Sequence, residues 1–205
     1  MFRDKGQLVL SLFVAALLWF VMFSPWTSPH VNFWLCMTAS AILLAGFACA
    51  FGRTTFNYQL SDFLWGFAIA ALLWGVFFVG DKVSQLIFPF ARTQVNIIYN
   101  MKGNISPTLL AMLLLLVIGP AEEVFWRGYV QKTLSKYRSP LVAFLLTTAC
   151  YTLVHLPSLN FMLIMAALVC GIFWGGLYWL MPEKLKAIII SHALWDAAAF
   201  VWLPF

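Results

Sequence analysis

Charged residues are scarce in this sequence. Only 9% of its 205 residues are Asp, Glu, Lys or Arg, whereas a typical soluble domain has about 25%. Hydrophobic residues make up 63%, which excludes a water-soluble fold and predicts an integral membrane protein in contact with the lipid bilayer. The net charge of +5 comes from Lys and Arg residues that stand singly between apolar runs. We therefore expect them in loops beside the membrane and predict no nucleic-acid partner.

Several motifs of hydrolases and metal sites are also missing. The sequence contains no His-Glu-x-x-His, which excludes a zinc-protease helix of that type, and no Gly-x-Ser-x-Gly, which excludes a serine-hydrolase elbow. Asp196 is the only aspartate within an apolar stretch, so a two-aspartate protease would lack its second acid. The four cysteines lie in apolar segments without Cys-x-x-Cys spacing, and we interpret them as small buried hydrophobic residues: Cys36, Cys49, Cys150 and Cys170.

Seven apolar stretches predict the fold. A membrane-spanning helix needs about 20 apolar residues, so the fold class is all-α, a polytopic helical bundle in a single domain over residues 1–205. An eighth span or a re-entrant segment stays open, and the motif-bearing core covers residues 105–203, with boundaries uncertain by about two to four residues. The stretches are Gln7–Phe23, Val31–Phe51, Phe63–Gly80, Ile105–Val130, Leu141–His155, Phe161–Leu180 and Ala187–Leu203.

The segments beside these stretches carry two further expectations. No small-x-small cleavage pattern follows the first stretch, so we expect it to be retained as a span. Val83–Phe90 is apolar but too short to cross, and we expect an interfacial helix there.

The positions of lysine and arginine predict the orientation in the membrane. With the N-terminus inside, three basic residues fall outside: Lys82, Arg92 and Lys102. Eight fall inside: Arg3, Lys5, Arg53, Lys132, Lys136, Arg138, Lys184 and Lys186. Because cytoplasmic loops carry the excess of positive charge, the N-terminus is predicted to be inside.

The most unusual stretch is Pro120–Arg127, which places two glutamates within an apolar segment. A charge in a span costs about 2.5 to 3.5 kcal/mol on insertion scales, so a functional role is the default hypothesis. Glu123 and Arg127 are four residues apart and can form an ion pair on one helix face. Glu122 lies about 100° around the helix and has no such partner, which makes it the free carboxylate.

Two histidines and one aspartate also lie within or at the end of apolar stretches. His192 precedes Asp196 by four residues, so the two share a helix face. Pro157 predicts that the helix before it ends beside His155, and Pro120 predicts a break that leaves the glutamates in a first helical turn. The aromatic residues of these segments are interpreted as packing or interfacial side chains: Trp126, Tyr129, Trp174, Tyr178, Trp179 and Trp195.

This set of polar residues suits hydrolysis by an activated water. A carboxylate in a low-dielectric medium is a stronger base, one imidazole can hold the water, and a second can stabilise an oxyanion. Zinc bound by Glu122, His155 and His192 is an alternative, although no cofactor is favoured. The pairs Glu123–Arg127 and His192–Asp196 can also be read as purely structural contacts between helices.

The order Glu122-Glu123-x-x-x-Arg127, Tyr151-x-x-x-His155, His192-x-x-x-Asp196 resembles the CPBP family, also called Abi proteins. These are CAAX-processing and bacteriocin-processing intramembrane proteases, and the eukaryotic prenyl-protein endopeptidase is a member. The resemblance covers Pro120 to Asp196. It implies an α-helical intramembrane endopeptidase that cleaves a hydrophobic or membrane-associated peptide, and, because the chain is short, a location in a bacterial plasma membrane.

The resemblance also implies roles for the residues of the motifs. Glu122 would activate water with help from His155, Glu123 and Arg127 would orient the site, and His192 and Asp196 would stabilise the oxyanion. The family usually has Phe where this chain has Tyr151, and the prenyl endopeptidase has Asn at the position of Asp196. A carboxylate donates no hydrogen bond unless it is protonated, so we assign Asp196 the orientation of His192.

Two other classes of function remain open. A non-catalytic scaffold or bacteriocin-immunity protein would keep the fold and bind a peptide, and it predicts that Glu122→Gln leaves function intact. A small proton-coupled transporter would use the same buried ionisable groups, and it predicts uptake that depends on a pH gradient. The halves of the sequence show no convincing similarity to support an inverted repeat.

Overall fold

The computed structural model of this protein describes residues 2–52 and 57–205, and side chains from Asp4 onward. Within these residues, seven helices are long and apolar enough to cross a membrane, which confirms the polytopic helical bundle. They are Asp4–Phe23, Phe33–Gly52, Leu60–Ile87, Pro107–Leu134, Pro140–Ser158, Phe161–Leu180 and Pro182–Trp202. Arg53, which we used to predict the orientation, lies outside the described residues.

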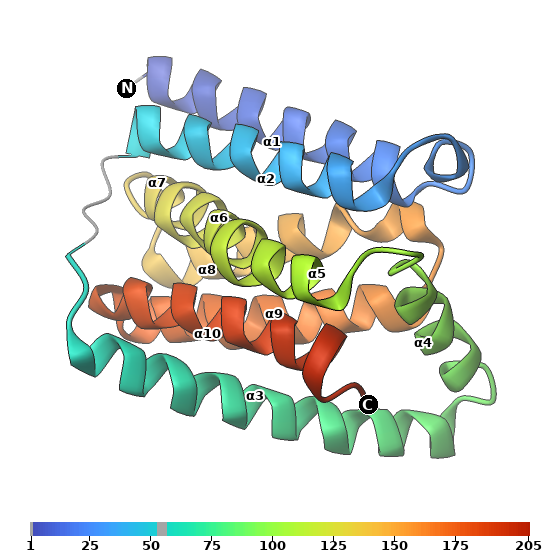
Figure 1. The fold of residues 1–205 in the computed structure, drawn as a ribbon. Helices are drawn as coiled ribbons and strands as arrows, with labels where there is room; N and C mark the ends of the chain where they lie inside the picture. The colour runs from blue at the N-terminus through green and yellow to red at the C-terminus, as the bar shows by residue number, and fades with distance from the viewer. Residues whose placement is uncertain (1, 53–56) are drawn as a thin grey trace.

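The first three spans are α1 (Phe2–Phe23), α2 (Phe33–Gly52) and α3 (Leu60–Ile87). In Figure 1, α1 and α2 lie side by side along one edge of the molecule and α3 lies along the opposite edge. The short helix α4 (Ala91–Asn100) follows α3 at one end of the bundle. The first three spans thus frame the rest of the chain.

The fourth and seventh spans occupy the middle. The fourth consists of α5 (Pro107–Leu113), α6 (Gly119–Phe125) and α7 (Lys132–Leu134), joined by two π-helical segments. The seventh is α10 (Leu185–Ala197), which packs against α3 and α6. The buried shares of these two spans are 56% and 61%, against 22% to 39% for the other spans, so the glutamate-bearing and histidine-bearing helices form the centre (Figure 1).

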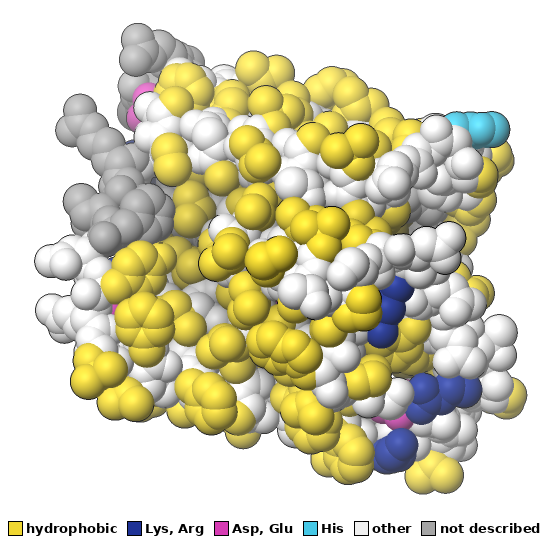
Figure 2. Space-filling model, viewed as in Figure 1, with side chains coloured by type: hydrophobic (Ala, Val, Ile, Leu, Met, Phe, Trp, Pro, Cys, Tyr) yellow, Lys and Arg dark blue, Asp and Glu magenta, His cyan; other side chains and the backbone are white. Residues whose placement is uncertain are grey.

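The remaining spans, α8 (Pro140–Leu153) and α9 (Phe161–Leu180), pack against each other on one side of the central pair. Apolar side chains cover the face of the molecule drawn in Figure 2, and Lys and Arg side chains gather towards one end of it. Large side chains such as Phe67, Leu72 and Leu86 are mostly exposed along α3. Lipid is the solvent that suits such a surface, because in water it would be an exposed apolar patch.

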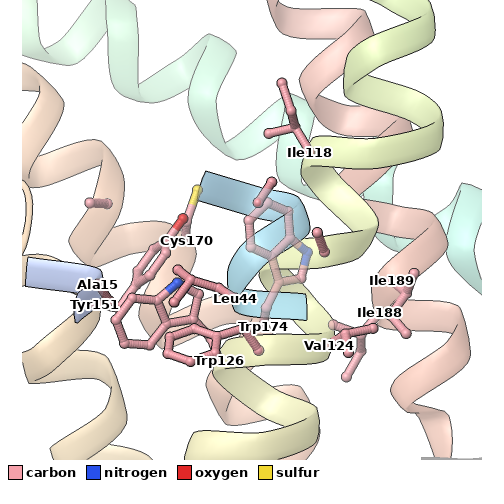
Figure 3. Close-up of a cluster of buried hydrophobic side chains, with 14 of the residues drawn as sticks. Ala15, Leu44, Ile118, Val124, Trp126, Tyr151, Cys170, Trp174, Ile188 and Ile189 are labelled. Carbon is pink, nitrogen blue, oxygen red and sulfur yellow. The ribbon is translucent and has the colours of Figure 1, made fainter. Parts of the chain in front are cut away.

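The core between the spans is aromatic. Figure 3 shows Trp126 from the fourth span beside Tyr151 from α8, with Trp174 and Cys170 from α9 close by. The rings of Trp126 and Tyr151 meet edge to face, with centroids 5.3 Å apart. Such pairs add about 0.5 to 1.5 kcal/mol beyond the area they bury, and they fix the helices that carry the polar residues.

A close approach of two backbones brings the fourth span to α10. A Cβ atom placed on Gly119 would lie 2.8 Å from Cα of Ala193, which is closer than real Cβ contacts. Only glycine therefore permits this contact between the helices, as small residues commonly do in membrane bundles. The approach places the turn after Gly119, with its two glutamates, against the turn of α10 that carries His192.

The predicted break at Pro120 is wrong, because the fourth span is continuous. Residues Leu114–Ile118 form a π-helical turn, and the amide of Gly119 donates to the carbonyl of Leu114, five residues back. The wider turn accommodates the residue that has no amide hydrogen without ending the helix. Glu122 and Glu123 consequently lie in mid-span and not at a helix start. A second π-helical segment covers Trp126–Gln131.

Two other local predictions fail and one is confirmed. Val83–Phe90 is not a separate interfacial helix, because α3 continues through Ile87 and the separate short helix is α4. Pro157 does coincide with a helix end: α8 stops at Leu153 and a single 3-10 turn, Leu156–Ser158, follows His155.

All four cysteines are free, but only Cys170 is buried. Cys49 is exposed and the other two are half-buried, so the prediction of buried cysteines holds only for Cys170.

Candidate active site

The structure brings the predicted polar residues of three spans into one region. Glu122, Glu123 and Arg127 come from the fourth span, His155 follows α8, and His192 and Asp196 lie on α10. Each is at most 8% exposed. Four of the six line a cavity of about 430 Å³: Glu122, His155, His192 and Asp196. Glu123 and Arg127 lie behind the wall of the cavity.

Glu123 is the centre of the contacts behind that wall. Its Oε1 accepts a hydrogen bond from Nη1 of Arg127 at 2.8 Å, which confirms the predicted ion pair within the helix. The same oxygen lies 2.7 Å from Nδ1 of His192 on α10. An ionised carboxylate only accepts hydrogen bonds, so Nδ1 of His192 carries a proton at this contact. Glu123 therefore fixes the tautomer and the orientation of His192.

Aromatic rings hold the other side of this ion pair. The guanidinium carbon of Arg127 lies 4.9 Å from the centre of the Tyr151 ring and 5.9 Å from that of Trp174. Trp174 also stacks on the imidazole of His192, with centroids 3.9 Å apart and planes at 19°. Desolvated cation–π contacts of this kind contribute about 2 kcal/mol and help to compensate a buried charge. Trp174 and Trp195 also line the cavity.

The predicted pairing of His192 with Asp196 is present but is the longer contact of the histidine. Nε2 of His192 lies 3.5 Å from Oδ2 of Asp196. With Nδ1 facing Glu123, Nε2 is the nitrogen that faces the cavity and Asp196. The imidazole thus has a carboxylate oxygen beside each ring nitrogen, and each of those nitrogens can hold a proton.

Glu122 is the carboxylate without a partner, as the sequence predicts. Within the described part of the chain, its Oε2 is buried and accepts no hydrogen bond. Leaving a buried polar group unsatisfied costs about 1 to 3 kcal/mol. Because Glu122 lines the cavity, a water molecule or a substrate entering that cavity could satisfy this oxygen.

His155 is held at both ring nitrogens. Nδ1 lies 2.7 Å from the carbonyl oxygen of Tyr151 one turn earlier, so it donates, and Nε2 is the acceptor. Nε1 of Trp19, on α1, donates to this Nε2 at 3.2 Å. Trp19 is fully buried. It is a residue of the site that the sequence did not reveal, because one tryptophan in an apolar span carries no local signal.

The alternative zinc site does not fit the arrangement of its three predicted ligands. In residues 2–52 and 57–205, no three His, Cys, Asp or Glu side chains lie close enough together to hold a metal ion. We derive no step through a metal from these residues.

Comparison with known protein families matches residues 104–198 to the model described as type II CAAX prenyl endopeptidase, Rce1-like. Residues 104–198 are thus similar to the CAAX protease family. It is a family of peptide hydrolases, and the match contains all six residues discussed above. Comparisons with curated proteins and with solved structures gave no significant match.

The matched segment begins just before the fourth span. Spans α1 to α3 and helix α4 lie outside the match, including Trp19. These elements nevertheless contribute to the cavity, which is also lined by residues of α1, α2, α3 and α4. The site is therefore built by the whole bundle around a core that carries the family motifs.

Proposed function

We propose that this protein is an intramembrane endopeptidase in which Glu122 activates a water molecule to hydrolyse a peptide bond. The observation that carries the proposal is the buried Oε2 of Glu122, which has no partner in the described structure although it lines the cavity shared with His192. A carboxylate that pairs with nothing is available to a proton, unlike Glu123, which binds both Arg127 and His192.

In the proposed reaction, Glu122 and His192 act on the reactants, and three further residues support them. Glu122 removes a proton from water, and the resulting hydroxide oxygen bonds to the carbonyl carbon of the substrate. Nε2–H of His192 donates to the oxyanion, while Glu123 and Asp196 hold the imidazole in place. When the C–N bond breaks, the proton on Glu122 passes to the leaving amine, and a free carboxylate end and a free amine result. Arg127 neutralises the charge of Glu123 throughout.

His155 has a role that depends on Trp19. Its Nε2 is the nitrogen that would accept a hydrogen bond from the attacking water, but this position is filled by the indole of Trp19. In the working enzyme the indole moves aside, and water takes its place on Nε2. Trp19 therefore keeps His155 in its neutral, correctly oriented form between reactions.

The test is cleavage of a hydrophobic peptide library by the detergent-purified protein, read by mass spectrometry. Wild type is compared with Glu122→Gln, with Glu183→Gln as the control because Glu183 is an exposed glutamate outside the cavity. We expect products from wild type and from Glu183→Gln but not from Glu122→Gln, and we expect no effect of a zinc chelator. Equal products from wild type and Glu122→Gln would refute Glu122 as the base. Loss of products on chelation, restored by added zinc, would replace the activated-water proposal with a metal mechanism.

A further inference from the structure

The cavity extends beyond the residues discussed so far. Its lining includes Phe77 and Asp81 of α3, Tyr99 of α4 and Phe205 at the end of the described chain. All of these lie outside the segment that matches the family model. They gather where α4 and the end of the chain approach α3 (Figure 1).

Residue Phe205 is held there in the way that a bound peptide would be held. Its amide donates to the hydroxyl of Tyr99 at 3.0 Å, and its carbonyl oxygen accepts from Nη1 of Arg92 at 3.2 Å. Two residues earlier, the carbonyl oxygen of Leu203 accepts from Nε1 of Trp74 at 2.9 Å. Side chains thus bind both backbone groups of Phe205, and this recognition does not depend on which peptide supplies the backbone. Burial raises the pKa of Tyr99, so its hydroxyl stays neutral in this role.

The ring of Phe205 lies in an aromatic slot. Its centroid is 5.6 Å from that of Trp74, with the planes tilted by 32°, and 6.0 Å from that of Phe77, with the planes at 25°. The slot is formed by Trp74 and Phe77 of α3, and it accepts a flat ring beside them. Offset stacking of this kind adds about 0.5 to 1.5 kcal/mol per aromatic pair, which makes the slot selective for an aromatic side chain.

Asp81 provides the observation that points to a second occupant. Its Oδ2 accepts hydrogen bonds from Nη2 of Arg92 and Nε2 of Gln85, both at 2.7 Å. Its Oδ1 is buried and has no hydrogen-bond partner in the part of the chain that the structure describes. The residue is 7% exposed and lines the cavity. Phe205 leaves this acceptor unused, whereas a peptide with one more N–H group in reach could bind it.

A continuous aromatic wall connects the slot with the reacting groups. Phe77 contacts Trp195 with ring centroids 4.6 Å apart, and Trp195 contacts Trp174 at 5.8 Å. Trp174 in turn stacks on His192. All four residues line the same cavity as Phe205. A peptide lying along this wall would have one residue in the slot and another beside His192 and Glu122.

We propose that Trp74, Phe77, Arg92 and Tyr99 form a substrate subsite that binds an aromatic residue of the peptide, and that residues 203–205 occupy this subsite until a substrate displaces them. Arg92 donates to the carbonyl oxygen of the bound residue, Tyr99 accepts from its amide, and Oδ1 of Asp81 accepts from a further N–H group. The inference rests on the proposed endopeptidase function and assigns part of its specificity.

The test compares two peptides that differ only in Phe or Ala at one scanned position. Phe205→Ala keeps the backbone groups but removes the competing ring and its contacts with Trp74 and Phe77, so KM for the Phe peptide should fall by about threefold or more with kcat unchanged. The control is Phe67→Ala, which removes a lipid-facing ring that is 68% exposed.

In the Phe205→Ala background, Arg92→Lys should raise KM for the Phe peptide more than for the Ala peptide. Arg138→Lys, at an exposed arginine, is the matched control.

Binding separates this inference from the proposed function. The affinity of a fluorescent Phe peptide is measured in a Glu122→Gln background, with and without Phe205→Ala, after thermal unfolding has shown that the variants are folded. Tighter binding after Phe205→Ala supports the subsite even if no cleavage is ever seen. Unchanged or weaker binding and an unchanged KM refute the subsite even if Glu122-dependent cleavage is established.

Discussion

At the scale of single residues, the two adjacent glutamates have opposite environments. Oε2 of each glutamate is buried without a hydrogen-bond partner in the described structure, but Oε1 of Glu123 binds a guanidinium and an imidazole. Neighbours in sequence therefore divide into a paired and an unpaired carboxylate, because successive helix positions point about 100° apart. The division leads to a stability prediction that needs no substrate.

Glu123→Gln should destabilise the protein far more than Glu122→Gln. Removing one partner of a buried ion pair leaves Arg127 uncompensated and costs about 3 to 5 kcal/mol. Glu122→Gln breaks no hydrogen bond of Oε2 in the described structure and should leave stability unchanged or slightly raised. Thermal unfolding of both variants in the same detergent measures the difference. Equal losses for the two variants would contradict the assignment.

Trp19→Phe should increase the rate of peptide cleavage. The change keeps an aromatic ring in the core but removes the N–H that occupies Nε2 of His155. One neutral hydrogen bond is worth about 0.5 to 1.5 kcal/mol net, so we expect kcat to rise by up to about tenfold. Steady-state kinetics measures it, with Trp26→Phe as the control at an exposed tryptophan. A lower kcat in a folded variant would show that the indole aids catalysis.

The sequence predicts contacts within a helix better than contacts between helices. The Glu123–Arg127 pair and the unpaired state of Glu122 follow from the helical repeat alone. The bond from Glu123 to His192 and that from Trp19 to His155 join different spans, and no local spacing encodes them. His192 was therefore expected to pair first with Asp196, although its closer partner is Glu123.

At the scale of helices, hydropathy predicts where the spans lie but not how they are wound. A hydropathy pattern does not predict the π-helical turn before Pro120, because the turn differs from an α-helix in its hydrogen bonding and not in its composition. The length of α3 was underestimated because Asp81 and Lys82 look like a loop. In the structure, Arg92 and Gln85 bind Asp81 and allow the helix to continue.

Gly119→Ala should impair both stability and activity. The added methyl group would lie 2.8 Å from Cα of Ala193 and would force the fourth span away from α10. Overpacking of this kind costs about 1 to 3 kcal/mol, and it also lengthens the contact between Glu123 and His192. Unfolding and cleavage assays measure the two effects. Gly75→Ala is the control, because its Cβ meets nothing within 4 Å, and it should be neutral or stabilising.

At the scale of the whole molecule, charged residues outside the cavity lie at the two opposite ends of the helical bundle. Lys5 lies over the ring of Tyr137, and Lys186 binds Asp62, so the start of α1, the loop before α8 and the starts of α3 and α10 share one end. Arg92 and Lys82 accompany Asp81 at the other end. This separation agrees with the arrangement assumed for the basic residues, and the side of the membrane is still a prediction.

Cysteine labelling tests that prediction. In a background without the natural cysteines, Ser135→Cys should react with a membrane-impermeant maleimide only after the inner face is exposed, because the basic end is expected inside. Thr93→Cys, at the opposite end, should react in intact cells. Both positions are exposed. Permeabilised membranes provide the control for reactivity, and a reversed pattern would place the N-terminus outside.

The hydrogen bond between Trp19 and His155 joins residues 136 positions apart, and the contact between Glu123 and His192 joins residues 69 positions apart. A ribosome delivers these partners to the membrane at different times. When the fourth span enters the bilayer, Glu122 has neither the histidine of the fifth span nor that of the seventh beside it. Under the proposed mechanism, the growing chain lacks the complete set of reacting groups until the last helix is inserted.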